Sequence, residues 1–148
     1  MKRFRFRLEK VLQYRLMLKD DRKRELMLEI KRLNETQSRL ERLRMAELAN
    51  ESALQAKSSA EVQLAGLYAF RLKAEIASTI EQIAQCEKSV EQARERYIEA
   101  TKEAEVLEQL KKRKKEQYEQ YVSKEEDKVL DELSVQSRTR LKRQGSAL

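Results

Sequence analysis

The sequence predicts an all-α protein that forms a long antiparallel two-helix coiled-coil hairpin. Of its 148 residues, 40% are charged and 5% are aromatic, so the side chains that fill a globular core are scarce. Pro is absent, Gly occurs twice, and the most frequent residues are the Ala, Leu, Glu, Lys, Arg and Gln of long helices, which argues against disorder. Apolar residues also recur at alternating steps of three and four, the spacing of a helix that packs along another helix.

The first predicted arm covers about residues 3–57. A first stripe follows this spacing at Leu26, Ile30, Leu33, Gln37 and Leu40. A second, made of small residues, follows it at Ala46, Ala49, Ala53, Ala56 and Ala60. The register shifts through Leu43 between the two stripes, and we expect such a shift to overwind or unwind the supercoil locally. Gln37 would be a polar position that fixes the register.

The turn between the arms is predicted within residues 57–68. Lys57, Ser58 and Ser59 lower the helix propensity there, and Gly66 is the only glycine before Gly145. Alanines on both sides of this segment allow two helix backbones to approach closely. These turn markers are short. Two alternatives therefore remain, a continuous helix through Gly66 and a homodimer of straight helices.

The second predicted arm covers about residues 68–133 and has the clearest pattern. Fourteen positions alternate steps of three and four, and only one of them is polar: Val62, Ala65, Ala69, Leu72, Ile76, Thr79, Ile83, Cys86, Val90, Ala93, Tyr97, Ala100, Ala104 and Leu107. One narrow apolar stripe therefore faces a partner helix. After the arm, residues 134–148 lose the periodicity, and we expect this basic tail to fray.

Charge is distributed unevenly along the chain. Residues 1–44 contain 15 Lys and Arg against 7 Asp and Glu, residues 45–100 contain 6 against 9, and residues 101–148 contain 12 against 10. A hairpin brings the two termini together, so its base is predicted to be basic and its turn end mildly acidic.

The composition argues against an enzyme. His is absent, Cys86 is the only cysteine and no stretch is rich in glycine, so the groups for a catalytic triad, a zinc site or a phosphate-binding loop are missing. We expect no catalytic residue, cofactor or metal ion. No apolar stretch is long enough to span a membrane and no secretory signal is visible, so the sequence predicts a cytoplasmic protein.

Two segments are candidate binding surfaces. Residues 4–12 alternate cationic and apolar side chains, and Phe4 and Phe6 have few obvious partners within the chain. We interpret this segment as a docking end. The alternatives are an ordinary helix start and a membrane-surface helix. Residues 111–115 are five consecutive basic residues flanked by acids, which is more typical of a solvated helix face than of a nucleic-acid site. We expect no nucleic acid as a partner. A basic coiled coil that binds nucleic acid or anionic membrane remains the alternative.

Three short motifs stand out along the chain: FRFRLEKVLQYR at 4–15, Tyr68-x-Phe70 before a helical stretch, and KVLDEL at 128–133. Together they resemble the bacterial flagellar export protein FliJ family. The resemblance covers nearly the whole chain. The coiled-coil proteins of virulence type III secretion systems and the central stalks of rotary ATPases are loosely similar.

The resemblance implies a non-enzymatic, stalk-like component of the flagellar type III export apparatus, at the cytoplasmic face of the inner membrane. It implies binding to the ring of the export ATPase FliI and to the export-gate protein FlhA, and escort of export chaperones. Carried over by position, the ring-binding residues would be Phe4, Phe6, Arg7, Leu8, Leu12, Leu130, Asp131 and Glu132. The gate-binding residues would be Leu72, Ile76, Thr79 and Ile83, which by spacing alone belong to the apolar stripe.

Overall fold

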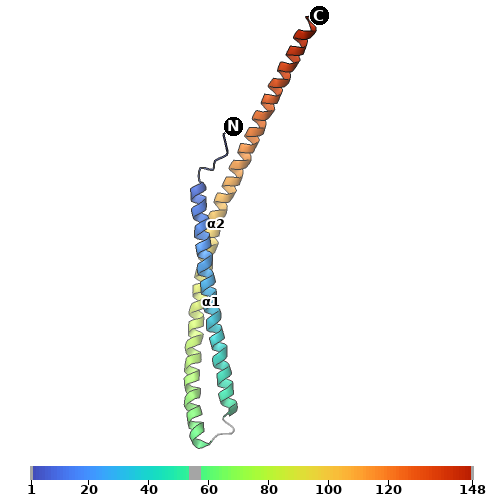
Figure 1. Ribbon diagram of the computed structural model, residues 1–148. Coiled ribbons are helices and arrows are strands. Elements are labelled where there is room, and N and C mark those ends of the chain that lie inside the picture. The colour runs from blue at the N-terminus through green and yellow to red at the C-terminus, as the bar shows by residue number, and fades with distance from the viewer. Residues whose placement is uncertain (1, 54–57, 148) are drawn as a thin grey trace. The chain divides into compact units, whose positions relative to one another are not determined.

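Two long α-helices make up the chain in a computed structural model, which describes residues 2–53 and 58–147. Helix α1 spans Glu9–Ala53 and helix α2 spans Ser59–Gly145 (Figure 1). The described ranges contain no strand, so the all-α prediction is confirmed. The chain divides into two compact units. Unit 1 is Met1–Tyr14 with Glu103–Leu148, and unit 2 is Arg15–Lys102.

Unit 2 is an antiparallel hairpin, in which α1 and α2 run side by side in opposite directions (Figure 1). Near the middle of the pair, Thr36 Oγ1 lies 3.9 Å from Cys86 Sγ. Near the turn, the side-chain amide of Asn50 donates a hydrogen bond of 3.1 Å to the Ala65 carbonyl oxygen. Residues early in α1 therefore meet residues late in this part of α2, which confirms the predicted hairpin.

The interior face of α2 is the predicted apolar stripe. Every stripe position from Ala65 to Leu107 is buried or half-buried, whereas Val62 at its start is exposed. The buried members are Ala65, Leu72, Thr79, Val90, Ala93, Ala100 and Ala104. Alanines dominate this set, so the two backbones can approach closely, as in tightly packed coiled coils.

The interior face of α1 differs from the predicted stripes. Steps of three and four run without interruption through positions that are all buried or half-buried: Leu12, Arg15, Lys19, Arg22, Leu26, Glu29, Leu33, Thr36, Leu40, Leu43, Glu47 and Asn50. Gln37, Ala49 and Ala53 are exposed, so the predicted register shift is wrong. Long polar side chains can lay their aliphatic stems on the partner helix while their charged ends reach water.

The helix ends also differ from the prediction. Residues 59–68 are helical, so the connection lies between Ala53 and Ser59, earlier than the predicted 57–68; residues 54–57 lie outside the described residues. The backbone N–H of Ser58 donates a 3.2 Å hydrogen bond to the Glu61 carboxylate, the reciprocal bond of a capping box. At the other end, α2 continues to Gly145 through most of the tail that was expected to fray.

Candidate protein-docking surfaces

The N-terminal segment of unit 1 packs on α2 through aromatic side chains. The rings of Phe4 and Tyr118 lie 5.6 Å apart between centroids at a tilt of 42°, a favourable geometry for an aromatic pair. The Tyr118 hydroxyl donates a hydrogen bond to the Lys2 carbonyl oxygen. Phe6 is half-buried as well. The expectation that the two phenylalanines have few partners within the chain is therefore wrong for Phe4, because its ring packs on Tyr118.

An ion pair fixes the first turn of α1 to the same helix. Lys111 Nζ lies 2.9 Å from a carboxylate oxygen of Glu9, and the Gln13 side-chain amide donates a 3.0 Å hydrogen bond to the other oxygen. The hydrogen bonds from Lys111 and Gln13 lower the pKa of Glu9. Leu12, one turn further along, is only 3% exposed. The first residue of the basic run 111–115 thus has a structural role within unit 1.

Beyond Tyr118, α2 carries an apolar groove with a volume of about 750 Å³. Its lining includes Tyr118, Tyr121, Val122, Val129 and Leu130, with two acidic side chains, Glu125 and Glu126, and Lys2 beside them. We call this set the unit 1 groove. Several of these apolar side chains are exposed, Leu130 by 63%. Clustered exposed apolar side chains rimmed by charge are typical of protein-binding surfaces.

The predicted ring-binding residues all belong to unit 1 but differ in exposure. Arg7, Leu8, Leu130, Asp131 and Glu132 are exposed, Phe4 and Phe6 are half-buried, and Leu12 is buried. Of these, Leu130 lines the unit 1 groove, and Phe4 packs on Tyr118, which lines it too. The exposed members are free to contact a partner, whereas the buried and half-buried ones position the N-terminal segment.

The predicted gate-binding residues lie in the interior of the unit 2 hairpin. Leu72 is 4% exposed and Thr79 is 1% exposed, while Ile76 and Ile83 are half-buried. The Thr79 hydroxyl donates a 2.7 Å hydrogen bond to the Glu75 carbonyl oxygen, so its polar group is satisfied inside the helix pair. Leu72 and Thr79 pack between the two helices, and their burial keeps them from contacting a partner protein.

Exposed apolar residues lie on the opposite side of α2, in the turns that precede Leu72. Leu64, Leu67 and Phe70 follow one another at steps of three, and Phe70 is 76% exposed. We call these three residues the outer patch. The outer patch was not predicted from the sequence, because the longer apolar stripe that includes Leu72 is the stronger periodic pattern. The short run of large apolar residues between stripe positions is the sequence feature that could have predicted it.

Neither helix contains, within the described ranges, an apolar stretch long enough to cross a membrane. In the same described residues, no group of three or more Cys, Asp or Glu side chains is arranged to hold a metal ion.

A family model described as the flagellar FliJ protein matches residues 4–143, nearly the full length. No curated protein and no solved structure matches the chain.

Proposed function

On the premise that this chain belongs to the flagellar FliJ family, we propose that it acts as a non-enzymatic stalk within the flagellar type III export apparatus. Family membership makes it a helical component of flagellar protein export. The proposal adds which partner protein each of the two units binds. The observation that carries the proposal is the exposed apolar unit 1 groove beside the docked N-terminal segment.

The partner at unit 1 is the ring of the export ATPase FliI. Leu130 in the groove supplies apolar contact area, while Asp131, Glu132 and Arg7 add charges that select the orientation. Phe4, Phe6, Leu8 and Leu12 belong to the same unit. Phe4 and Leu12 act through their packing within unit 1, which holds the N-terminal segment beside α2.

The partner at unit 2 is the export gate, and its subunit FlhA is the proposed contact. Leu72 and Thr79 are buried, so they do not make this contact. The contact is made instead by the outer patch on the preceding turns of α2, with Leu67 and Phe70 as apolar anchors. Escort of export chaperones, and a location in the cytoplasm at the inner membrane, belong to the same proposal.

The mechanism requires no chemistry on this chain. A ring of identical subunits presents a repeating surface, and a single stalk contacts only some subunits at one time. Its differential contacts then favour one conformation in those subunits. Helix α2 is continuous from Ser59 to Gly145 and contributes to both units, so one element carries both binding surfaces.

The test measures the ATPase rate of the purified export ATPase with and without this chain. Wild-type chain should raise the rate, and Leu130→Asp should abolish the increase because a charge enters the groove. Val106→Asp is the matched control, since Val106 is 65% exposed on the same helix and does not line the groove. Absence of stimulation by the wild type, or equal loss in both variants, would overturn the proposal. Binding that decays steeply with salt and needs residues 112–115 would favour the nucleic-acid or membrane alternative instead.

A further inference from the structure

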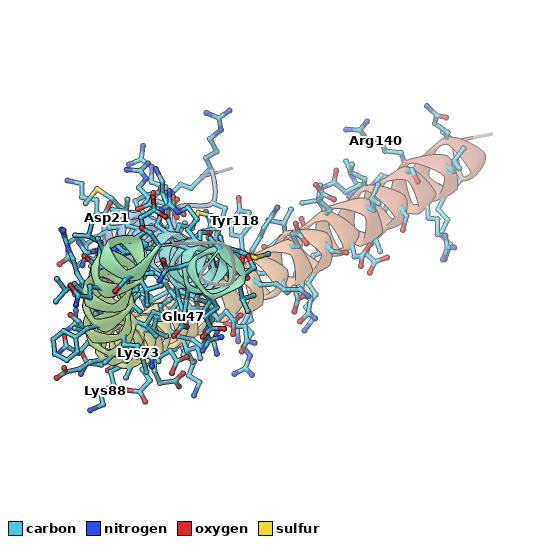
Figure 2. All side chains as sticks on the ribbon, turned by 90° about the horizontal axis from the view of Figure 1, so that it is seen from below. Asp21, Glu47, Lys73, Lys88, Tyr118 and Arg140 are labelled. Carbon is cyan, nitrogen blue, oxygen red and sulfur yellow. The ribbon has the colours of Figure 1, made fainter. Side chains whose placement is uncertain are left out.

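The last part of α2 is an exposed helix with an apolar face. Every described residue from 126 to 147 is exposed, and Arg140 extends from this stretch in Figure 2. Val122, Val129 and Leu133 recur at steps of seven and four, which places them on one face of the helix. Leu130 and Leu141 flank that face.

This stretch lacks the packing that usually stabilises a helix. Isolated helices are marginal in water, and most helical stability in proteins comes from covering an apolar face. Grooves occur along the face, one lined by Val122, Val129 and Leu130 and a second lined by Leu133, Ser137 and Leu141. A second helix laid along the face would fill both.

The charges of this stretch identify the partner. Residues 125–132 contain five acids and one base, whereas residues 138–143 contain four bases and no acid. The acidic half and the basic half are therefore complementary to each other. A helix with the same sequence in the opposite direction matches both halves, whereas the same helix in parallel would place acid against acid and base against base.

We propose that a second copy of this chain binds here, with residues 122–143 of the two copies packed antiparallel about a twofold axis at Leu133. The spacing fits this arrangement. Positions 122, 126, 129, 133, 136, 140 and 143 alternate steps of four and three, and reversal about 133 brings Glu126 opposite Arg140. Leu133 then meets its own symmetry mate, and Val129 lies beside Gln136 of the other copy.

This self-association does not depend on the stalk function. Leu130 and Glu132 lie at the edges of the paired face and also belong to the surface proposed for the ATPase ring, so the two partners would compete for this surface. The mass of the chain alone tests self-association, and ATPase stimulation at saturating chain concentration tests ring binding, so failure of one proposal is distinguishable from failure of the other.

The first test is the mass of the full chain in solution, measured by light scattering and sedimentation at increasing concentration. Wild-type chain should be a dimer, and Leu133→Asp should be a monomer that keeps the helical circular dichroism of the unit 2 hairpin. Val106→Asp, at a position of similar exposure elsewhere on α2, should remain a dimer. A wild-type chain that stays monomeric at every concentration, or a Leu133→Asp variant that stays dimeric, would overturn the proposal.

Charge reversal tests the direction of the pair. Arg140→Glu should break the dimer, because the substitution places a carboxylate opposite Glu126 of the other copy and two repulsions replace two attractions. The double variant Glu126→Arg with Arg140→Glu should restore the dimer. In a Cys86→Ser background, Glu126→Cys chains should form disulfides with Arg140→Cys chains but not with themselves. Cross-linking of Glu126→Cys chains to one another would show a parallel pair and reject the proposed one.

Discussion

Leu67 and Leu72 are leucines of the same helix in opposite environments. Leu72 is 4% exposed inside the unit 2 hairpin, whereas Leu67 is 69% exposed on the outer patch. Leu72→Ala should lower the free energy of unfolding by about 2–5 kcal/mol, because a buried side chain is lost and a cavity remains. Leu67→Ala should change it by less than about 0.5 kcal/mol. Denaturant unfolding followed by circular dichroism measures both, and equal losses would contradict the assigned packing.

Glu9 provides a pH-dependent contact between the N-terminal segment and α2. Its pKa is lowered below the ordinary value of 4.5, because Lys111 and Gln13 donate hydrogen bonds to the carboxylate. A carboxyl group with a lower pKa in the folded state adds stability that is present above the ordinary pKa and is lost as the pH falls through the folded value. We therefore expect the N-terminal segment to loosen from α2 as the pH falls below 4.5.

Nuclear magnetic resonance of the Tyr118 ring, which lies against Phe4, reports this loosening. Glu9→Gln should show the loosened spectrum at every pH, while Glu116→Gln on the same unit should behave like the wild type. A Tyr118 spectrum that does not respond to Glu9→Gln would show that the ion pair does not hold the segment.

Asn50 connects the two helices of unit 2 near the turn. It is buried, and its side-chain amide donates a 3.1 Å hydrogen bond to the Ala65 carbonyl oxygen. Asn50→Ala should lower the free energy of unfolding by about 0.5–1.5 kcal/mol, because the hydrogen bond between the two helices is lost while the Ala65 carbonyl keeps the backbone bond within α2. Asn34→Ala, on an exposed position of α1, should have little effect. Equal effects in thermal unfolding would show that the bond between the helices does not set the stability of this end.

The interior of α2 was predictable from sequence, whereas that of α1 was not. In α2 nearly all interior positions are apolar, so the spacing is visible in the residue types. In α1 the interior includes Arg15, Lys19, Glu29 and Glu47, which apolar periodicity does not detect. Their stems can cover apolar surface only when a partner helix is present, so the sequence of α1 alone does not identify them.

The ends of the helices were predicted poorly for a related reason. Gly66 was treated as a turn marker, but it lies within α2. The stronger signal was Ser58 followed by Glu61, a capping box that begins a helix. At the C-terminal end, the loss of apolar periodicity was taken as the loss of helix. Periodicity reports packing against a partner, and the residues of 134–145 still favour helix without one.

The candidate ring-binding residues stay a prediction. Among them Leu130 is an exposed apolar residue that lines the unit 1 groove. The gate-binding residues were taken from a family resemblance at positions that the spacing had already assigned to the interior, and the burial of Leu72 and Thr79 agrees with the spacing. For this chain, positions on the stripe are poor candidates for partner contact, and large apolar residues between stripe positions are better ones.

Across the whole molecule, the proposed function depends on two binding surfaces. The unit 1 groove and the outer patch are apolar, exposed and carried by different units. If the unit 1 groove serves both the ATPase ring and a second copy of the chain, dimers withhold the stalk from the ring. The monomeric variant Leu133→Asp should then reach half-maximal ATPase stimulation at a lower chain concentration than the wild type. An equal or higher concentration would contradict competition between the two partners.

The central claim, that unit 1 binds the ATPase ring and unit 2 binds the gate, is tested most directly by photo-cross-linking in the assembled apparatus. A photoreactive amino acid replaces Leu130 in one chain and Phe70 in another, and the cross-linked proteins are identified by mass spectrometry. The account predicts cross-links to the export ATPase from position 130 and to the gate protein from position 70. Cross-links to the ATPase from position 70 alone, or to neither protein from either position, would contradict it.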